Sequence, residues 1–205
     1  MYSKVIKRCF DFILSLAACV PFLPVYVIVA ILIKAEDNGP VFYCGERIGR
    51  NGKIFKMYKF RSMKVNAPDI RNEDGSTYNS QNDPRVTKIG SFIRKTSIDE
   101  LPQILNIVKG DMSIIGPRAT LGNGFDTFEG NDIEKLKVRP GLTGYTQAYH
   151  RNDISLREKR QKDVWYANNV SFILDIKIFF KTISTVLLRK GLYTNDDKKT
   201  EKETV

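Results

Sequence analysis

Two adjacent carboxylates, Asp99 and Glu100, are the residues of this sequence with the clearest potential for chemistry. Carboxylates can hold Mg²⁺, and an aspartate can also attack phosphorus to form an acyl phosphate. Taken alone, such a pair at a helix N-terminus is more often a helix cap with a neighbour that suits the helix dipole. The pair stands directly before apolar residues that recur at helical spacing, namely Leu101, Ile104, Leu105 and Val108.

The start of the predicted helix can be drawn in two ways. With Asp99 as N-cap, Pro102 falls in the first turn, where its missing N–H costs least. With Ser97 as N-cap, Glu100 has the spacing of a capping box, although Pro102 then lies deeper in the helix. In either case we expect the positive end of the helix dipole to help keep Asp99 ionised.

Five basic residues are candidates for binding the phosphate groups of a substrate. A guanidinium group contacts two phosphate oxygens at once, which makes arginine the usual choice for such a site. The candidates are Lys59, Arg61, Arg94, Arg118 and Arg139. Such residues are also commonly surface charges or structural partners of carboxylates. The lysines and aromatic residues interleaved between positions 53 and 64 further resemble a nucleic-acid-binding stripe.

The composition excludes several other kinds of site. A single histidine, His150, leaves no basis for a Ser-His-Asp triad or a histidine-rich metal site. Three cysteines without CxxC spacing, Cys9, Cys19 and Cys44, predict neither a disulfide framework nor a zinc site. The net charge of +10 requires a polyanionic partner or an anionic surface, such as nucleic acid, lipid headgroups or phosphorylated small molecules.

An uncharged apolar segment runs from Phe12 to Ile33 and is long enough to cross a bilayer as a helix. Pro21 and Pro24 lie near its centre, where they predict a sharp kink or break. Basic residues flank both ends, which favours placing both ends on the cytoplasmic side. We therefore expect a re-entrant helix-break-helix that enters one leaflet and returns; a proline-kinked spanning helix is the alternative.

The expected fold class is mainly α with short β elements, in which a compact α/β cytosolic domain with surface-lying amphipathic helices follows the membrane segment. The polar stretch 66–85 predicts a loop. Apolar periodicity predicts short strands at 41–44 and 54–60, separated by a turn at 49–52, and helices at 87–95 and 171–188.

Four ordered stretches carry a family resemblance. The longest is TSIDELPQILNIVKGDMSIIGPR at residues 96–118. The others are FKMYKFRSM at 55–63, DPRVTKIG at 83–90 and RPGLTG at 139–144. Together they resemble the bacterial sugar transferase family, the monotopic phosphoglycosyl transferases. The resemblance extends from residue 1 to about residue 190, and the chain length matches small members that consist of the catalytic unit alone.

The resemblance implies a re-entrant membrane helix, an active site on the cytoplasmic face of the bacterial inner membrane, and a two-step reaction with Mg²⁺ as cofactor. Asp99 would attack the sugar-proximal phosphate of a UDP-sugar, release UMP and carry the phosphosugar until undecaprenyl phosphate accepts it. Asp99 and Glu100 would hold the metal, or Glu100 would manage the proton of the acceptor. Lys59, Arg94 and Arg118 match family positions close to phosphate, and Arg139 matches a loop near the nucleotide.

The domain division that follows is a membrane helix at 1–34, a membrane-associated catalytic domain at 35–190 and a charged, disordered tail at 191–205. Further expected partners are anionic membrane lipids, a second copy of the chain and downstream glycosyltransferases, but no nucleic acid. Two rival hypotheses are a catalytically inactive scaffold of a glycan assembly complex and a membrane-tethered nucleic-acid binder.

The sequence departs from the family pattern at three places. Ala119 follows Arg118 where the family often has proline, and Leu23 precedes Pro24 where a serine is common. The stretch 145–150 also differs, and we relate it to the choice of sugar or nucleotide. Neither the sugar nor the glycan pathway (capsule, O-antigen, exopolysaccharide or glycoprotein) follows from the sequence.

Overall fold

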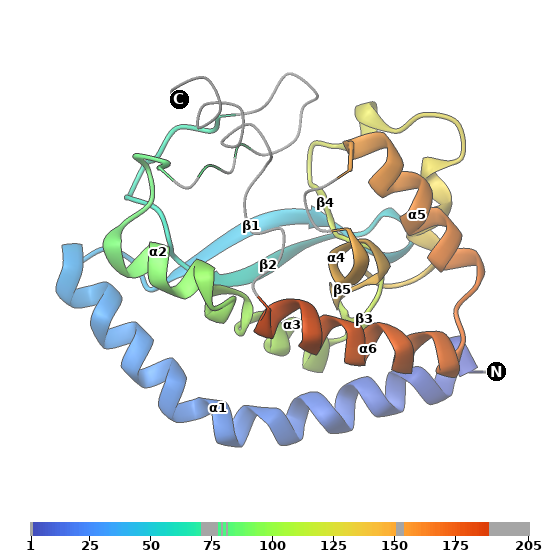
Figure 1. Ribbon diagram of the computed structural model, residues 1–205, viewed down its shortest axis with the longest axis horizontal. Coiled ribbons are helices and arrows are strands. Elements are labelled where there is room, and N and C mark those ends of the chain that lie inside the picture. The colour runs from blue at the N-terminus through green and yellow to red at the C-terminus, as the bar shows by residue number, and fades with distance from the viewer. Residues whose placement is uncertain (1, 71–77, 79, 81, 151–153, 189–205) are drawn as a thin grey trace.

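The computed structural model of the protein is mainly helical, and its strands are few and short, which confirms the predicted mixture of elements (Figure 1). Helical residues make up 57% of it. The structure describes residues 2–70, 78, 80, 82–150 and 154–188. The predicted tail at 191–205 and part of the predicted loop at 66–85 lie outside the described residues.

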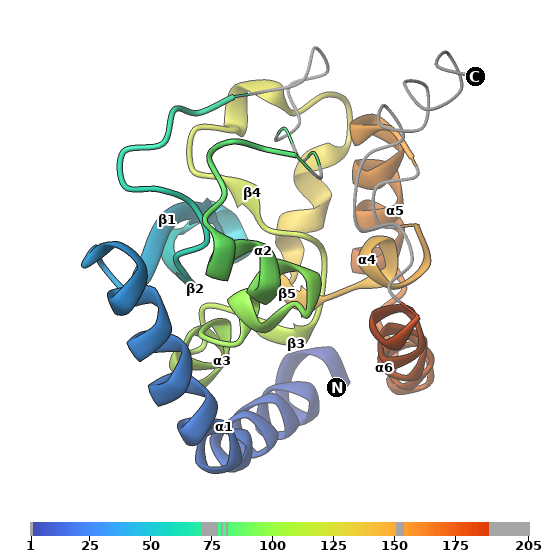
Figure 2. The same cartoon turned by 60° about the vertical axis from the view of Figure 1, so that its left-hand side comes forward.

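The first long element is α1 (Lys7–Asp37), which continues a π-helical turn at Tyr2–Ile6. Of the predicted kink or break, the structure has the kink. The helix runs without a gap through Pro21 and Pro24, so the expected break is wrong, but its axis bends between the two halves (Figure 1, Figure 2). The bent helix follows the underside of the molecule in Figure 1. A proline removes only one intrahelical hydrogen bond, so the intact turns on either side can preserve the helix while the axis bends.

Both halves of α1 contact the same body of the protein. Near its start, Asp11 accepts hydrogen bonds from Ser113 Oγ at 2.7 Å and from the N–H of Ile114 at 3.0 Å. In the second half, Tyr26 Oη donates to the carbonyl of Leu101 at 2.7 Å, and Val29 and Ile33 pack in the core. Each half of the helix is therefore anchored to the domain.

Two small sheets form the centre of the domain. The first has the order β2-β1-β4 and is antiparallel. The second pairs β3 with β5 in parallel. The strands are β1 (Phe42–Ile48), β2 (Ile54–Phe60), β3 (Ser113–Ile115), β4 (Thr120–Leu121) and β5 (Gly141–Thr143). The prediction at 54–60 is confirmed, whereas β1 extends beyond the predicted 41–44.

The predicted helices at 87–95 and 171–188 are confirmed as α2 (Lys88–Lys95) and α6 (Phe172–Leu187). Side chains cap both, since Thr87 accepts from the N–H of Gly90 and Ser171 accepts from the N–H of Leu174. The 3₁₀ turn at Arg50–Gly52 confirms the predicted turn at 49–52. Elements that the sequence analysis did not anticipate are α4 (Tyr145–Tyr149), α5 (Leu156–Asn168) and 3₁₀ turns at Phe125–Thr127 and Asp132–Lys137.

Helix α5 escaped prediction because its residues are mostly polar and show no apolar stripe. Its start nevertheless carried a usable signal. Ser155 accepts a hydrogen bond from the N–H of Glu158, and the Glu158 carboxylate accepts from the N–H of Ser155. This is the capping-box spacing, which marks a helix start independently of hydrophobic periodicity.

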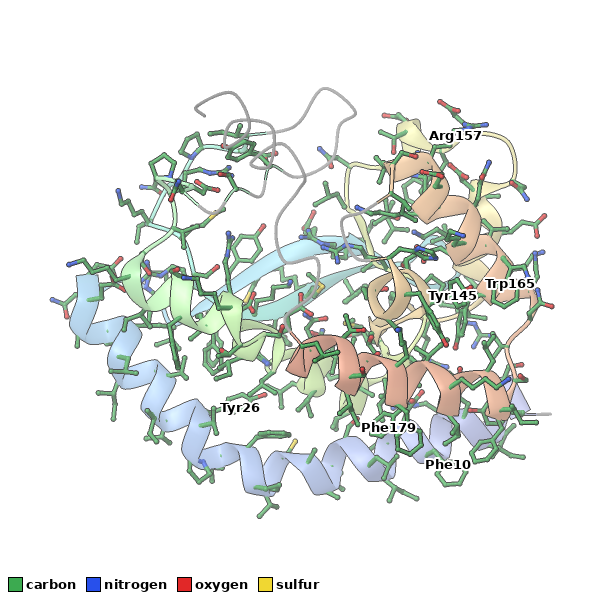
Figure 3. All side chains as sticks on the ribbon, viewed as in Figure 1. Phe10, Tyr26, Tyr145, Arg157, Trp165 and Phe179 are labelled. Carbon is green, nitrogen blue, oxygen red and sulfur yellow. The ribbon has the colours of Figure 1, made fainter. Side chains whose placement is uncertain are left out.

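The outer surfaces of α1 and α6 are unusually apolar for a protein surface. Figure 3 shows the side chains of α1, such as Phe10, projecting from the helix, and Phe179 on the neighbouring α6. Among the described residues, α1 is the one helix long and apolar enough to cross a membrane by length and composition, and only 11% of its most apolar window is buried. The core helix of a soluble protein would be mostly buried, so this surface requires an apolar environment or partner.

Candidate active site

The Asp99–Glu100 pair lies in a 3₁₀ turn (Ile98–Glu100) between α2 and α3 (Gln103–Lys109). Both predicted capping arrangements are wrong. The N-cap of α3 is Pro102, and no side chain caps either this helix or the preceding turn. Ser97 instead adopts a left-handed conformation with φ 58°. The Asp99 carboxylate therefore caps neither element.

Burial sets the acidity of Asp99. Its side chain lies within the protein, and the residue is 9% exposed. The pKa of Asp99 is raised from 3.8 to about 6, mainly because burial removes its hydration; the charge of Glu100 contributes to the rise, and the charges of Lys59 and Arg94 offset part of it. The expectation that a helix terminus keeps Asp99 ionised is therefore wrong in direction, because desolvation outweighs the nearby positive charges.

Lys59 is the basic residue in direct contact with the pair. Its Nζ donates to Glu100 Oε1 at 2.5 Å. Lys59 lies on the same face of β2 as Phe55 and Met57, and α3 covers this face through Ile107. The strand therefore delivers Lys59 to the edge of the core, where it meets Glu100. This ion pair also argues against an uninterrupted basic stripe for nucleic acid along 53–64.

Asn106 holds α3 against β2 and was missed in the sequence analysis. This residue is fully buried; it accepts a hydrogen bond from the N–H of Tyr58 at 2.9 Å and donates to the carbonyl of Lys56 at 2.8 Å. The Asn106 amide thus makes the hydrogen bonds that a neighbouring strand would make with the edge of β2. The sequence signal that could have found it is an Asn within a predicted apolar helix. A buried amide needs hydrogen-bond partners, so such a residue predicts a specific polar contact.

Two of the predicted arginines lie on either side of Ser62 and have different surroundings. Arg94 of α2 donates from Nε to Ser62 Oγ at 2.8 Å, and its charge lowers the pKa of Asp99. Arg61 forms a bidentate ion pair with Asp37, with N–O distances of 2.5 and 2.7 Å. The same guanidinium also donates to the carbonyls of Pro40 and Met63. Arg94 therefore belongs to the carboxylate site, whereas the contacts of Arg61 secure the end of α1.

The contacts that the structure shows for Arg118 and Arg139 are with residues other than the carboxylate pair. Arg139 Nε donates to the carbonyl of Gly110 at 2.7 Å, which is at the C-terminal end of α3, opposite the end that carries Asp99. Arg118 is exposed after β3, and its backbone N–H donates to Asp163 of α5 at 3.2 Å. Phosphate binding by these two residues stays a prediction.

The 3₁₀ turn that carries Asp99 and Glu100 lies against α1. The Tyr26 hydroxyl reaches Leu101, the residue directly after Glu100, and Ile98 packs on the core cluster that includes Val29 and Ile33 (Figure 3). Other side chains of the same helix are apolar and exposed, with Leu23 62% and Ile31 62% accessible. The turn that carries Asp99 therefore packs on a helix that also presents an apolar surface.

The predicted specificity stretch 145–150 forms part of an aromatic cluster. The ring of Tyr145 stacks on Tyr149 at 4.8 Å and lies 5.0 Å from Trp165, and Lys181 lies over Tyr149 at 5.5 Å (Figure 3).

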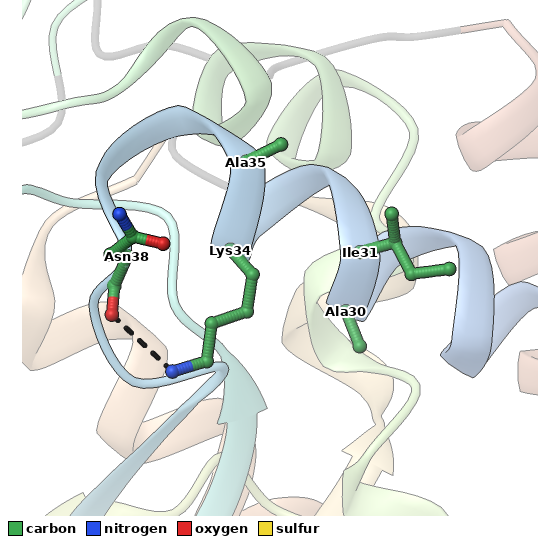
Figure 4. A pocket seen from close by; sticks show the side chains of 5 residues that line it. All are labelled: Ala30, Ile31, Lys34, Ala35 and Asn38. Atoms are coloured by element: carbon green, nitrogen blue, oxygen red, sulfur yellow. Dashed lines mark hydrogen bonds between the residues drawn. The ribbon is translucent and has the colours of Figure 1, made fainter.

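A separate hollow at the end of α1 has Lys34 as its one charged lining residue, and this lysine donates to the carbonyl of Asn38 (Figure 4). None of the residues lining that hollow belongs to the carboxylate site.

Across the part of the chain that the structure describes, no three His, Cys, Asp or Glu side chains converge to hold a metal. Two adjacent carboxylates nevertheless suit Mg²⁺, which usually binds one or two carboxylates and completes its shell with water and substrate phosphates. The site therefore contains the buried Asp99 carboxylate of raised pKa, the Lys59–Glu100 ion pair beside it, and the positive charge of Arg94.

Comparison with known proteins gives a consistent result. The chain is 41% identical over 199 residues to the exopolysaccharide production protein ExoY of Rhizobium meliloti, covering 91% of this chain and 88% of that protein. It is 38% identical to the undecaprenyl-phosphate galactose phosphotransferase of Salmonella typhimurium, covering 93% of this chain and 42% of the relative. A UDP-N-acetylgalactosamine-undecaprenyl-phosphate N-acetylgalactosaminephosphotransferase of Aeromonas hydrophila is 39% identical, over 91% of this chain and 44% of the relative.

The chain spans about two fifths of the length of several of the curated relatives that it matches, at 42–43%. The family model described as "Bacterial sugar transferase" matches residues 2–189, which is nearly the whole chain and includes every residue of the carboxylate site. This chain therefore belongs to the bacterial sugar transferase family.

Proposed function

We propose that the chain transfers a sugar-1-phosphate from a UDP-sugar to undecaprenyl phosphate, with Asp99 as a covalent nucleophile. The observation that carries the proposal is the buried Asp99, of raised pKa, beside the Lys59–Glu100 ion pair and against the apolar helix α1. Two relatives are named for transfer of sugar phosphates to undecaprenyl phosphate, which supports the same chemistry.

The reaction proceeds in two displacements at the same phosphorus. An oxygen of Asp99 attacks the phosphorus next to the sugar, a new O–P bond forms, and the bond to the bridging oxygen breaks, so that UMP leaves with the electron pair. A phosphate oxygen of undecaprenyl phosphate then attacks this phosphorus and releases the Asp99 carboxylate. In this mechanism the positive charges of Lys59 and Arg94, which act on Asp99, offset the negative charge that develops on the phosphates.

Asp99 and Glu100 are the residues that would hold Mg²⁺ in this proposal. The metal would supply positive charge to the diphosphate as the leaving group departs. The Lys59 contact holds the Glu100 carboxylate in one position, and Arg94 adds a second fixed cation next to Asp99. Because Lys59 neutralises Glu100, the site can accept an anionic substrate close to two carboxylates.

The position of α1 supports the re-entrant arrangement over the spanning one. Arg8 donates to the carbonyls of Ile107 and Val108, and Glu36 accepts from the N–H of Lys88, so contacts with the domain occur near both ends of the helix. A spanning helix would carry one end to the far side of the bilayer and lose one set of contacts. The bilayer would cover the exposed faces of α1 and α6 and place Asp99 at the cytoplasmic membrane surface, within reach of a lipid-bound acceptor.

Cysteine accessibility tests this topology. In a variant whose three native cysteines are replaced by serine, Ser3→Cys and Asn51→Cys are expected to react with a membrane-impermeant maleimide only in inverted vesicles. Both positions are exposed, and none of the native cysteines is in a disulfide. The position-51 variant serves as the control for the domain side. Labelling at position 3 but not at position 51 in intact cells would refute the re-entrant arrangement.

The acidity of Asp99 predicts an acid limb in the pH profile. Since the pKa of Asp99 is raised to about 6, the residue is protonated and unreactive below that pH. At pH 5 about one tenth of it is ionised, so kcat/KM for UMP release should fall about tenfold from its value at pH 7.5. The Glu100→Gln variant removes a charge that raises this pKa and should move the limb to lower pH. A flat profile between pH 5 and pH 7.5 would contradict the assignment.

The function itself is tested by UMP release from a panel of UDP-sugars, including galactose, glucose and N-acetylated amino sugars. Sustained release is expected for at least one sugar when Mg²⁺ and undecaprenyl phosphate are both present. Without the acceptor, release should stop at about one UMP per enzyme, because the phosphosugar stays on Asp99. A folded protein that turns over no nucleotide sugar would favour the scaffold hypothesis, and tight, salt-dependent binding to DNA or RNA would favour the nucleic-acid hypothesis.

A further inference from the structure

A second cluster of cations lines a cavity of about 200 Å³ at the N-terminal end of α1, far along α3 from the carboxylate pair. The cavity lies between α1, β3, the loop before β5 and the α5–α6 connection. Its charged lining residues are Lys7, Arg8, Asp11, Arg50, Lys137 and Arg139. Five of these carry positive charge and one carries negative charge.

The two lysines of the cavity already have anionic partners. Lys7 Nζ lies 2.7 Å from Asp175 Oδ2, and Lys137 Nζ lies 2.8 Å from Glu134 Oε2. The carboxylate of Asp11 accepts from Ser113 and Ile114, so its hydrogen bonds hold α1 against β3. Apart from the two paired lysines, the charged lining of the cavity consists of the arginines Arg8, Arg50 and Arg139 and the single carboxylate of Asp11.

Arg8 and Arg139 have a structural role that accounts for part of their presence. Arg8 donates to the carbonyls of Ile107 and Val108 at 2.6 and 2.9 Å, and Arg139 donates from Nε to that of Gly110. These carbonyls close the C-terminus of α3, where positive charge suits the helix dipole. Burial, with the nearby charges of Arg50 and Arg8, lowers the pKa of Arg139, so the cluster is short of negative charge.

Arg50 has no such structural role. Its guanidinium makes no hydrogen bond or ion pair with any residue in the described part of the chain, and its Nε is buried without a partner. An unpaired buried donor beside two like charges is unfavourable, and the fold would be more stable without it. The arrangement is explained when an anion with several oxygens occupies the cavity and accepts from Arg50 and the Nη atoms of Arg139.

The surroundings of the cavity indicate the source of that anion. Exposed apolar side chains lie next to it on the first turns of α1 and α6, with Phe10 50% and Ile173 68% accessible (Figure 3). The ring of Phe172 lies 5.8 Å from that of Tyr2 and 6.4 Å from that of Phe10, which joins the two helices into one apolar surface. A cationic cavity beside such a surface suits a phosphate group with hydrocarbon chains attached.

We propose that this cavity binds the phosphate of a membrane phospholipid headgroup, with Arg50 and Arg139 as its ligands and the acyl chains along Phe10 and Phe172. The bound lipid fixes the N-terminal end of α1 at the bilayer surface. It is a different site from the carboxylate pair, because the 3₁₀ turn Ile98–Glu100 and the carbonyls of residues 107–110 lie at opposite ends of α3. The lipid site does not depend on the proposed chemistry.

The test uses the purified full-length chain in neutral detergent micelles and follows its Tm as phosphatidylglycerol is added. The half-saturating mole fraction should be about tenfold higher for Arg50→Gln than for the parent chain, as expected for loss of a charge-assisted contact. The matched control is Lys53→Gln, which removes the same charge from an exposed residue directly after the same turn and should change the value less than about twofold.

Further arms separate the sources of phosphate. Diacylglycerol, which has the chains without the phosphate, should give no such shift, and inorganic phosphate and UDP should neither reproduce it nor displace the lipid. Arg50→Gln should be at least as stable as the parent chain without lipid, because it removes the unpaired donor. Arg50→Lys keeps the positive charge but loses the bidentate guanidinium. Its half-saturating mole fraction of phosphatidylglycerol should lie between those of the parent chain and Arg50→Gln.

Several results would overturn the proposal. They are equal responses of the parent chain and Arg50→Gln, an equal response to diacylglycerol, and displacement of the lipid by inorganic phosphate or UDP. The Asp99→Asn variant should bind the lipid as the parent chain does. Loss of UMP release with intact lipid binding, or the reverse, therefore distinguishes failure of the proposed function from failure of this site.

Discussion

Replacing Asp99 with asparagine should abolish UMP release from the UDP-sugar that the parent chain accepts, with a loss of at least about 10³-fold. The amide has no anionic oxygen that can attack phosphorus, so neither the covalent phosphosugar nor the first UMP should form. The same UMP-release measurement, run without acceptor, should show no stoichiometric burst. Mass spectrometry should find a phosphosugar on the parent chain and none on the variant.

The matched control for this experiment is Asp126→Asn, which makes the same chemical change at an exposed position and should retain parental activity. Glu100→Gln should be slower than the parent chain but less impaired than Asp99→Asn, because it disturbs charge around the nucleophile without removing it. Full turnover by Asp99→Asn would sink the covalent mechanism, whatever the other variants do.

The second large effect concerns stability, and its direction is opposite to that of the first. The same Asp99→Asn substitution is expected to stabilise the fold at pH 7.5 by up to about 3 kcal/mol, since it removes a charge that burial makes unfavourable. The reason is the difference between the pKa of Asp99 in the folded chain, about 6, and its ordinary value of 3.8. Denaturant unfolding of both chains in the same detergent and in Mg²⁺-free buffer measures the difference.

The pH dependence of this difference follows from the sign of the pKa shift. Because folding raises the pKa, the folded chain holds the Asp99 proton more tightly than the unfolded chain does. The cost of the buried charge is therefore absent below about pH 3.8, grows as pH rises, and is complete above about pH 6. The stability advantage of Asp99→Asn should be large at pH 7.5 and clearly smaller at pH 5.

Asp126→Asn again provides the control, because an exposed carboxylate has no burial penalty to relieve. A destabilised Asp99→Asn chain, or a gain that is the same at both pH values, would show that burial does not set the acidity of Asp99. Together the two predictions describe a residue that costs the fold stability in return for reactivity, as buried catalytic groups often do.

Several features of this protein were determined by the sequence itself. The apolar spacing within 54–60, 87–95 and 171–188 predicted the strand and two helices that the structure contains. These elements depend on local periodicity and caps, which can be read from neighbouring residues. The ordered motifs around Asp99 and Glu100 likewise sufficed to indicate the family. The reactive role of this pair stays a prediction.

The local geometry of the turn that carries Asp99 and Glu100 was only partly determined in this way. The sequence predicted a helix N-cap before the apolar residues, either Ser97 or Asp99. The chain instead forms a 3₁₀ turn there, and α3 begins after Pro102. Packing of Ile98 and Leu101 against α1 and the core decides between such alternatives. The same holds for α1, where the two prolines predicted a kink or a break and the helix continues with a bend.

Tertiary structure alone decided the electrostatics. Lys59 and Glu100 are 41 residues apart in the chain, and Arg61 finds its carboxylate in Asp37 rather than at the site. Arg139 lies with Arg8 at the far end of α3, although the sequence grouped it with the phosphate-binding residues. Burial of Asp99 reversed the expected direction of its pKa shift. The acidity of a group and its ionic partners depend on which distant segments exclude water around it, and that information is absent from local spacing.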